Sequence, residues 1–356
     1  MNIQNNISLK KYNSFKIDSI AKHFIEINNE TELLELIKNY NFNSEKYFIL
    51  GNGTNVLFAS DFYDGLIIKN NIKHTLKLEL INNEKNGDML KNNILLSQKN
   101  ILITASSGID YDDLLKEYFT FLTKNDLTFF SGLENLSQIP TSVGAAVVQN
   151  VGAYSVEQNN FFYECSAINL LNGELKFFNK NESNFDYRNS FFKQNPNYFI
   201  TEVKYIISLN DTPILNYADL NNIVSDNINP KNIYNDIAEI RKNKIPSHID
   251  FPNCGSFFKN PIISEDTFNN IIKQHPNIVN YKNNNKIKLS AANLIEDCGL
   301  KGYRIGDVGI SDKHSLFIIN YGNATGKDIV SFAEFIVNKI NIKYGIKLLP
   351  EVVIVN

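Results

Sequence analysis

The stretch Gly-Asn-Gly-Thr-Asn-Val at residues 51–56 organises the N-terminal part of this chain. It follows an apolar run, Tyr47 to Leu50, that is typical of a short buried strand, and Val56 to Phe58 continue as a further strand. Its two glycines let the backbone approach a phosphate closely. The dinucleotide-binding fingerprint is not matched, because the third glycine is missing and no helix follows. Taken alone, the stretch is more typical of an ordinary tight turn than of a phosphate site.

A second stretch, GLENLSQIPTSVGAAVVQNVGAY at 132–154, is rich in small residues. After Pro140, the small residues Ser142, Gly144, Ala145 and Ala146 leave room for a large planar or phosphorylated ligand against bare backbone, and exposed amides can neutralise a pyrophosphate. The alternative is a tightly packed turn and strand without a ligand. Together, the two stretches favour a ligand site.

The composition sets the broad class of the protein. At 356 residues, two or three domains are expected. With 35 Lys and Arg against 38 Asp and Glu, a nucleic-acid footprint is not indicated. Cys165, Cys254 and Cys298 lie far apart, so neither a metal site nor a disulfide framework is predicted. No apolar run approaches the length of a membrane span, and we expect a soluble, cytoplasmic protein.

Helix and strand signals alternate along the chain without a repeat. Asp110 is suited to cap a helix, and segment 73–100 is polar and irregular. Short β-rich pieces over 161–209 predict an antiparallel meander. The inward side of the helix after Asp110 would carry Leu114, Leu115, Tyr118 and Phe119. The other predicted elements are helices over 30–40, 232–242, 290–298 and 327–341, and strands over 47–50, 101–105 and 346–355.

A third stretch, Asn-Cys-Gly-Ser-Phe-Phe-Lys-Asn-Pro at 253–261, places reactive groups in an apolar turn. It combines the hydroxyl of Ser256, the ammonium of Lys259 and the amide of Asn260. An isolated serine in a Gly-Ser turn would normally bond to the backbone.

The run 255–261 resembles the substrate loop of the UDP-N-acetylenolpyruvoylglucosamine reductases, and four further motifs of that family follow the same order along nearly all 356 residues. These enzymes are bacterial flavoproteins that complete UDP-N-acetylmuramic acid for peptidoglycan synthesis, and so serve cell wall biogenesis, cell shape and cell division. The stretches 51–56 and 132–154 resemble their flavin cradle and that of the oxidase superfamily related to vanillyl-alcohol oxidase. The resemblance implies FAD as cofactor and NADPH as co-substrate.

The implied fold class is α+β. A two-subdomain FAD-binding module of the vanillyl-alcohol oxidase type would occupy residues 1–72 and 73–212, and a C-terminal α/β substrate-binding domain residues 213–350. The closing strand, 351–356, would pair back into the first subdomain.

Implied FAD contacts come from both glycine-rich stretches. Thr141, Ala145 and Ser155 depart from the family pattern, which usually has glycine there, and the side chain of Thr141 could shift the flavin. The implied cofactor-binding residues are Gly51, Asn52, Gly53, Thr54, Asn55, Pro140, Thr141, Ser142, Gly144, Ala145, Gly152 and Tyr187.

The resemblance also implies three catalytic residues. Hydride arriving at C3 of the enolpyruvyl group pushes charge toward C2 and its carboxylate, so a proton donor and electrophilic stabilisation are needed. Ser256 matches the proton donor, Arg188 the carboxylate-binding arginine of a Tyr-Arg-x-Ser motif, and Glu351 the second acidic group. The alternatives are a surface ion pair for Arg188 and a solvated strand-end carboxylate for Glu351.

Substrate phosphates need cations away from the reacting centre. Lys244 and Asn260 match residues that contact the UDP portion, and Lys259 would add charge. Tyr217 matches a tyrosine loop that closes over the diphosphate in one subclass of the family. The alternatives are a solvated helix end for Lys244 and ordinary packing for Tyr217.

The sequence therefore predicts an NADPH-dependent reductase of UDP-N-acetylglucosamine enolpyruvate in the tyrosine-loop subclass. Its partner would be a small-molecule sugar nucleotide, with no metal, nucleic acid, membrane or obligate protein partner. Two alternatives stay open, a flavin-linked oxidase and a non-catalytic UDP-sugar binding protein. An oxidase often needs a covalent flavin attachment residue such as His, and neither cradle stretch contains one.

Overall fold

The computed structural model describes residues 2–81, 100–210, 212–215, 220 and 228–356. The chain forms two compact units. The first contains Met1–Gln4, His23–Asn52 and Gly65–Arg241, and the second contains Asn5–Lys22, Gly53–Asp64 and Lys242–Asn356. In the described ranges, no helix is both long and apolar enough to cross a membrane.

A four-stranded sheet has the order β1 (Gln4–Ser8), β2 (Ile20–Ile27), β5 (Phe62–Asn70) and β3 (Tyr47–Leu50), and β3 with most of β2 and β5 belongs to the first unit. Helix α1 (Glu30–Asn39) buries Leu33 and Leu36 against Leu66 and Ile68. Asn29 caps α1 by accepting a bond from the amide of Glu32. The helix and the strand predicted over 30–40 and 47–50 are confirmed.

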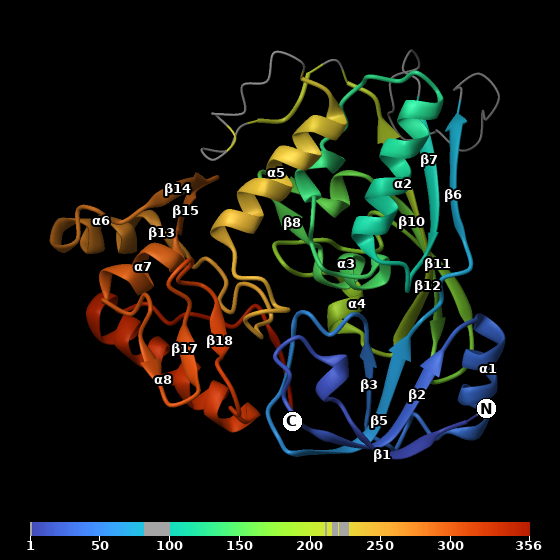
Figure 1. Ribbon diagram of the computed structural model, residues 1–356, viewed down its shortest axis with the longest axis horizontal. Helices are drawn as coiled ribbons and strands as arrows, with labels where there is room; N and C mark the ends of the chain where they lie inside the picture. Colours follow the sequence, from blue (N-terminus) through green and yellow to red (C-terminus); the bar gives the residue numbers. More distant parts are fainter. Residues whose placement is uncertain (1, 82–99, 211, 216–219, 221–227) are drawn as a thin grey trace. The chain divides into compact units, whose positions relative to one another are not determined.

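A second, antiparallel sheet of the first unit has the order β11 (Leu175–Asn179), β10 (Phe162–Asn169), β12 (Tyr198–Ser208), β7 (Asn100–Ser106) and β6 (Leu76–Ile81). The antiparallel strands predicted over 161–209 are confirmed, but their meander order is not, because β12 pairs with β10 and not with β11, the strand before it in sequence. Helix α2 (Tyr111–Lys124) lies against this sheet and buries the predicted apolar side (Figure 1). Asp110 caps α2 as predicted.

The prediction that 73–100 is irregular was wrong for β6. Leu76, Leu78 and Leu80 alternate with polar residues, and this two-residue period lets Leu76 and Leu78 pack on the core while β6 pairs with β7. Residues 82–99 lie outside the described residues.

Shorter elements complete the first unit: α3 (Val143–Gln149), α4 (Phe191–Gln194), most of α5 (Pro230–Lys244), β8 (Gly152–Ala153), β9 (Val156–Glu157) and the 3-10 helices η2 (Leu133–Leu136) and η3 (Gln158–Asn160). Helix α5 confirms the helix predicted over 232–242. Since the first unit ends at Arg241, most of α5 lies there, whereas the sequence placed residues from 213 onward in the substrate domain.

The second unit contains the 3-10 helix η1 (Lys10–Tyr12) and three small sheets: β13 (Ile262–Ser264), β15 (Lys286–Leu289) and β14 (Asn280–Asn283); β16 (Arg304–Ile305), β17 (Val308–Ile310) and β18 (Ile318–Asn320); and β19 (Val353–Val355) with β4 (Val56–Phe58). β19 and β4 pair in parallel, so the closing strand pairs with a segment of residues 1–72.

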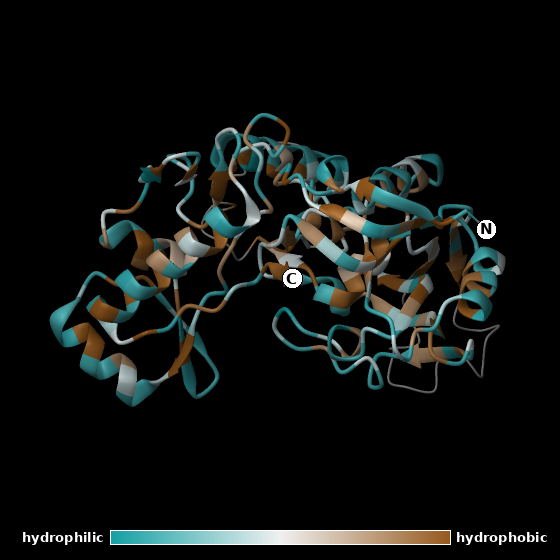
Figure 2. Cartoon of the chain, turned by 90° about the horizontal axis from the view of Figure 1, so that it is seen from below, coloured by the Kyte–Doolittle hydropathy of each residue, from teal (hydrophilic) through white to brown (hydrophobic). Residues whose placement is uncertain are grey.

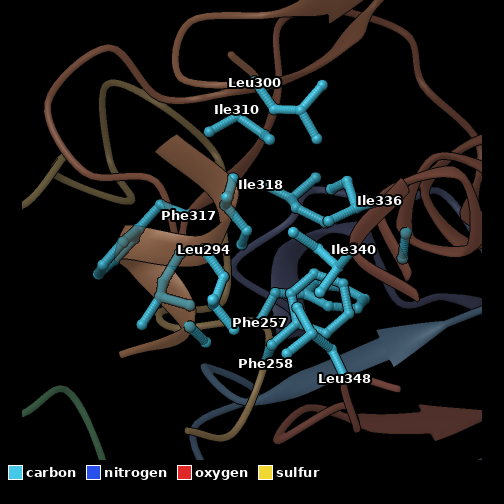
Figure 3. Packing of buried hydrophobic residues seen from close by; sticks show 14 of the residues in the cluster. Phe257, Phe258, Leu294, Leu300, Ile310, Phe317, Ile318, Ile336, Ile340 and Leu348 are labelled. Carbon is cyan, nitrogen blue, oxygen red and sulfur yellow. The ribbon is translucent and has the colours of Figure 1, made fainter. Parts of the chain in front are cut away.

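Helices α6 (Glu265–Gln274), α7 (Ala291–Asp297) and α8 (Gly326–Tyr344) enclose the core of the second unit. Figure 3 shows Phe257, Phe258, Ile340 and Leu348 packed together in this core. Gly299 and Gly345 follow α7 and α8 with φ of +69° and +67°, the left-handed conformation that ends helices. Bands of hydrophobic and hydrophilic residues alternate along the helices, as expected when one side is buried (Figure 2).

Candidate active site

The two glycine-rich stretches meet within the first unit. A Cβ on Gly51 would lie 3.0 Å from Cβ of Ala145 and 3.1 Å from Oγ of Ser142. Nδ2 of Asn52 donates to Oδ2 of Asp110 at 3.0 Å, and Asp110 pairs with Ser142 through a β-bridge. The stretch 51–56 therefore lies beside the stretch 132–154, directly at Gly51 and through Asp110 at Asn52, as expected if both stretches line one ligand.

The second stretch forms a short helix where the sequence suggested bare backbone. The amides of Thr141, Val143 and Gly144 donate to the carbonyls of Ile139, Ile109 and Ser107 at 2.8, 2.9 and 2.8 Å. These three amides are therefore engaged, which corrects the expectation that they are exposed to a pyrophosphate. Glycine is required at 144, since a Cβ would lie 2.8 Å from Cβ of Ser107.

The remaining groups of this site suit a polar cofactor. Ser142 is 1% exposed, and its hydroxyl has no hydrogen-bond partner within the described structure. A buried hydroxyl is normally bonded. Gly51 has no side chain to cover this hydroxyl, so a bound group can reach it and accept or donate a hydrogen bond. The residues present therefore fit a polar cofactor such as FAD.

The departures from glycine have different local consequences. Ser155 has a φ of +67°, so a side chain occupies a left-handed position that glycine adopts with less strain. Thr141 is buried, with 8% exposed. The Cβ of Ala145 instead restricts position 51 to glycine or another very small residue, because a Cβ there would lie 3.0 Å from it.

In the second unit, Gly53 is required by its surroundings. It has a φ of +69°, and a Cβ there would lie 1.9 Å from the carbonyl oxygen of Tyr12. The carbonyl of Gly53 accepts a bond from the amide of Ser14 at 3.0 Å. The stretch 51–56 therefore packs against residues 12–14 at this point.

Arg188 is held by the first unit in a defined orientation. Its side chain is 17% exposed, and NH2 donates to the carbonyl of Gly152 at 2.7 Å. NH1 lies 3.8 Å from Oε1 of Glu157, and the guanidinium lies 5.3 Å from the ring centre of Tyr187. The exposed surface ion pair considered from the sequence is therefore not what is found.

The loop with Ser256 is fixed by backbone pairing on both sides. The amide of Phe257 donates to the carbonyl of Leu316, and the carbonyl of Phe257 accepts from the amide of Glu351, both at 2.8 Å. Phe257 is 0% exposed, and its ring contacts Phe258 at 5.0 Å (Figure 3). The pairing brings the segments of Ser256 and Glu351 together.

Burial and the charge of Glu351 both affect the pKa of the thiol of Cys254, which precedes this loop. Burial raises the pKa of Cys254, and the charge of Glu351 raises it further. Gly255 between Cys254 and Ser256 has a φ of +79°, which favours glycine. Asn253 is buried, and its Oδ1 accepts from the amide of Gly255 at 2.9 Å.

The substrate-binding candidates differ in their surroundings. Oδ1 of Asn260 accepts from the amide of Ala291 at 2.9 Å, so this side chain also helps to begin α7. Lys259 is half-buried, and its amide donates to the carbonyl of Leu349 at 2.9 Å. Lys244 is the exposed last residue of α5. Tyr217 lies outside the described residues.

Sequence reasoning missed Glu157 and Lys193, whose side chains contact Arg188, and Gln149, which accepts a bond from Nζ of Lys193. Their only signal was proximity to the motifs at 132–154 and 184–193. Within the described ranges, no group of three or more His, Cys, Asp or Glu side chains could hold a metal ion.

Fold and site define a protein that binds FAD. Residues 21–176 match the model of an FAD binding domain family, and residues 247–355 match the C-terminal domain of UDP-N-acetylenolpyruvoylglucosamine reductase. The reductase of Flavobacterium johnsoniae is 35% identical, with 99% of each chain covered. That of Buchnera aphidicola is 37% identical over 98% of this chain and 95% of the relative.

The chain belongs to the UDP-N-acetylenolpyruvoylglucosamine reductase family. It is an FAD-dependent oxidoreductase of peptidoglycan precursor synthesis, and the fold class predicted from the sequence is confirmed. The crystal structure of the reductase from Thermus caldophilus shares the fold, with a TM-score of 0.64, 21% identity and complete coverage of both chains.

Proposed function

We propose that Ser256, Arg188 and Glu351 carry the protein's share of the reduction of UDP-N-acetylglucosamine enolpyruvate to UDP-N-acetylmuramate. Bound FAD supplies the hydride, which it takes from NADPH, and the enolpyruvyl group gains that hydride at C3 and a proton at C2. The chain itself must therefore deliver the proton and stabilise the negative charge that develops on the carboxylate.

Ser256 is the proposed proton donor. A serine hydroxyl is a weak acid, so it donates only where a strongly basic carbon centre develops beside it, and reduction of the enolpyruvyl group creates such a centre. The observation that carries the proposal is the pairing of Phe257, the residue after Ser256, with both Leu316 and Glu351, which fixes the backbone next to Ser256. A fixed backbone favours a directed hydroxyl.

Arg188 and Glu351 are proposed to stabilise the substrate carboxylate. A guanidinium offers a permanent charge and forked donors that match a carboxylate. The low exposure of the Arg188 side chain supports this role, because the charge is less screened than at the surface. Glu351 is proposed to act as the second acidic group, and its half-buried position supports this.

Lys244, Lys259 and Asn260 are proposed to bind the sugar nucleotide, and Tyr217 to close over its diphosphate, as in the tyrosine-loop subclass. A cytoplasmic location also stays a prediction.

The proposed FAD contacts are Gly51, Asn52, Gly53, Thr54, Asn55, Pro140, Thr141, Ser142, Gly144, Ala145, Gly152 and Tyr187. The closeness of Gly51 to Ser142 and Ala145 supports these three members of the set.

Ser256→Ala tests the proposal, because it deletes a hydroxyl and little else. We expect FAD content and flavin bleaching by NADPH to match the wild type, while anaerobic addition of the enolpyruvyl substrate leaves the flavin reduced. Stopped-flow flavin absorbance measures both halves, and equilibrium titration measures substrate binding. Equal loss in both halves would show that Ser256 shapes the site instead. Rapid reoxidation of the wild type by oxygen, with no response to substrate, would contradict the reductase itself.

A further inference from the structure

The turn that carries Arg188 is strained. Asp186 and Asn189 exchange two backbone hydrogen bonds of 3.0 Å, so Tyr187 and Arg188 form the tip between them. Arg188 has a φ of +53°, in the left-handed region that disfavours a residue with a Cβ. Such a backbone persists only where its surroundings hold it. The contacts of this turn therefore decide where the guanidinium lies.

The end of α3 supplies those contacts. The segment 186–193 bonds to three successive residues there. The bonds run from Oγ of Ser190 to the carbonyl of Val148 at 2.7 Å, from Nζ of Lys193 to Oε1 of Gln149 at 2.7 Å, and from Nδ2 of Asn150 to the carbonyl of Asp186 at 3.0 Å. Helix α3 begins at the contact with Gly51, so one short helix joins the proposed flavin cradle to the Arg188 turn.

Lys193 has a particular place among these contacts. Its Nζ donates to Oε1 of Gln149 at 2.7 Å and also to the carbonyl of Arg188, the strained residue itself, at 3.1 Å. Hydrogen bonds from an ammonium are stronger than those between neutral groups. The amide of Lys193 in turn bonds to Oγ of Ser190, which fixes the start of α4. A single cation thus ties the Arg188 backbone to α3.

We infer that Lys193 is a positioning residue for the reduction. Its ammonium holds the strained turn against α3, so that the guanidinium of Arg188 keeps the orientation needed for the substrate carboxylate. This inference rests on the proposed function of Arg188. Without the ammonium, the Arg188 carbonyl loses a donor and the turn relaxes, which displaces the guanidinium while the residue itself is still present.

Lys193→Met tests the inference, because methionine keeps an unbranched side chain and removes the charge. We expect unchanged FAD content and unchanged bleaching by NADPH. Flavin reoxidation by the enolpyruvyl substrate should slow roughly 10- to 100-fold, the range for a small misplacement in an active site. Lys193→Arg retains a cation and should restore most of that rate. Lys124→Met, at the exposed end of α2, is the matched control and should behave as the wild type.

A double-mutant cycle separates positioning from other effects. In an Arg188→Ala background, Lys193→Met should slow reoxidation no further, because the group it positions is gone. Additive slowing, a wild-type rate in Lys193→Met, or loss of FAD and of both half-reactions in that variant would overturn the positioning role. A wild-type rate in Arg188→Ala would instead overturn the proposed function of Arg188, and the inference with it. Titration of the oxidised proteins with UDP-N-acetylmuramate measures binding independently of turnover.

Discussion

Two glycines of this chain show how differently one residue type is constrained. Gly53 and Gly302 both have left-handed backbones, with φ of +69° and +72°. Around Gly302, no atom lies within 4 Å of the place a Cβ would take, whereas at Gly53 the carbonyl oxygen of Tyr12 lies 1.9 Å away. Only Gly53 is required by packing as well as by conformation.

Gly302→Ala should therefore lower the free energy of unfolding by about 1 kcal/mol, the cost of the left-handed conformation alone. Gly53→Ala should lower it considerably more, because the Tyr12 carbonyl must also move, and it should reduce the FAD retained on purification. Urea denaturation and flavin absorbance measure the two quantities. If both substitutions lowered the free energy of unfolding equally, the backbone around Gly53 would be able to move away from a Cβ at little cost.

At the scale of elements, the short helix η2 buries a carboxyl. Glu134 is 0% exposed, and the amide and hydroxyl of Ser131 donate to it at 3.2 and 3.0 Å. Burial raises the pKa of Glu134 above its ordinary value of 4.5, more than these hydrogen bonds lower it. The folded chain thus holds this proton to a higher pH than the unfolded chain does.

Stability from Glu134 is therefore complete below pH 4.5 and is lost as the pH rises from there toward the raised pKa of the folded state. Glu134→Gln cannot ionise. Its melting temperature relative to the wild type should rise with pH above about 4.5 and then level off. Thermal unfolding between pH 4 and 8 checks this, with exposed Glu117→Gln on α2 as the control. If the difference in melting temperature between Glu134→Gln and the wild type did not change with pH, the raised pKa of Glu134 would be contradicted.

Elements whose signals are local were predicted well. Helices α1, α2 and α8 have caps and a hydrophobic period that the chain shows directly. β6 and α3 were missed for different reasons. Three leucines in a polar segment give a weak strand signal, and α3 is stabilised by bonds from Val143 and Gly144 to residues 107–109, which no local pattern shows.

At the scale of the whole molecule, the two units hold different groups of site candidates. Gly51, Ser142 and Arg188 belong to the first, and Ser256 and Lys244 to the second. The division does not follow the proposed roles, because Arg188, proposed to bind the substrate carboxylate, lies in the first unit, and the proposed FAD contacts Gly53 and Thr54 lie in the second. The sequence placed the boundary at 212–213, and that assignment of roles to residues 213–350 stays a prediction.

Lys244→Ala should raise the dissociation constant for the sugar nucleotide, because it removes the positive charge that is proposed to attract a substrate phosphate. FAD content and bleaching by NADPH should not change. Raising the salt concentration should weaken wild-type binding and narrow the difference between the two proteins. Isothermal titration with UDP-N-acetylmuramate measures both effects, and exposed Lys286→Ala on β15 is the control. Normal binding by Lys244→Ala would leave Lys244 as a solvated helix end.

The sequence by itself determined the family, the cofactor, the reaction and the principal helices, because motifs and hydrophobic periods are local properties of the chain. Tertiary structure decided which distant residues meet. Gly51 lies so close to Ala145 that a Cβ would meet it, Glu351 pairs with Phe257, and Asp112 accepts a bond from Tyr234, 122 positions later. The Lys193 bond to Arg188 spans five positions, yet it depends on the left-handed backbone of that turn and on α3. Such contacts follow from how elements pack together, and no window of sequence contains that information.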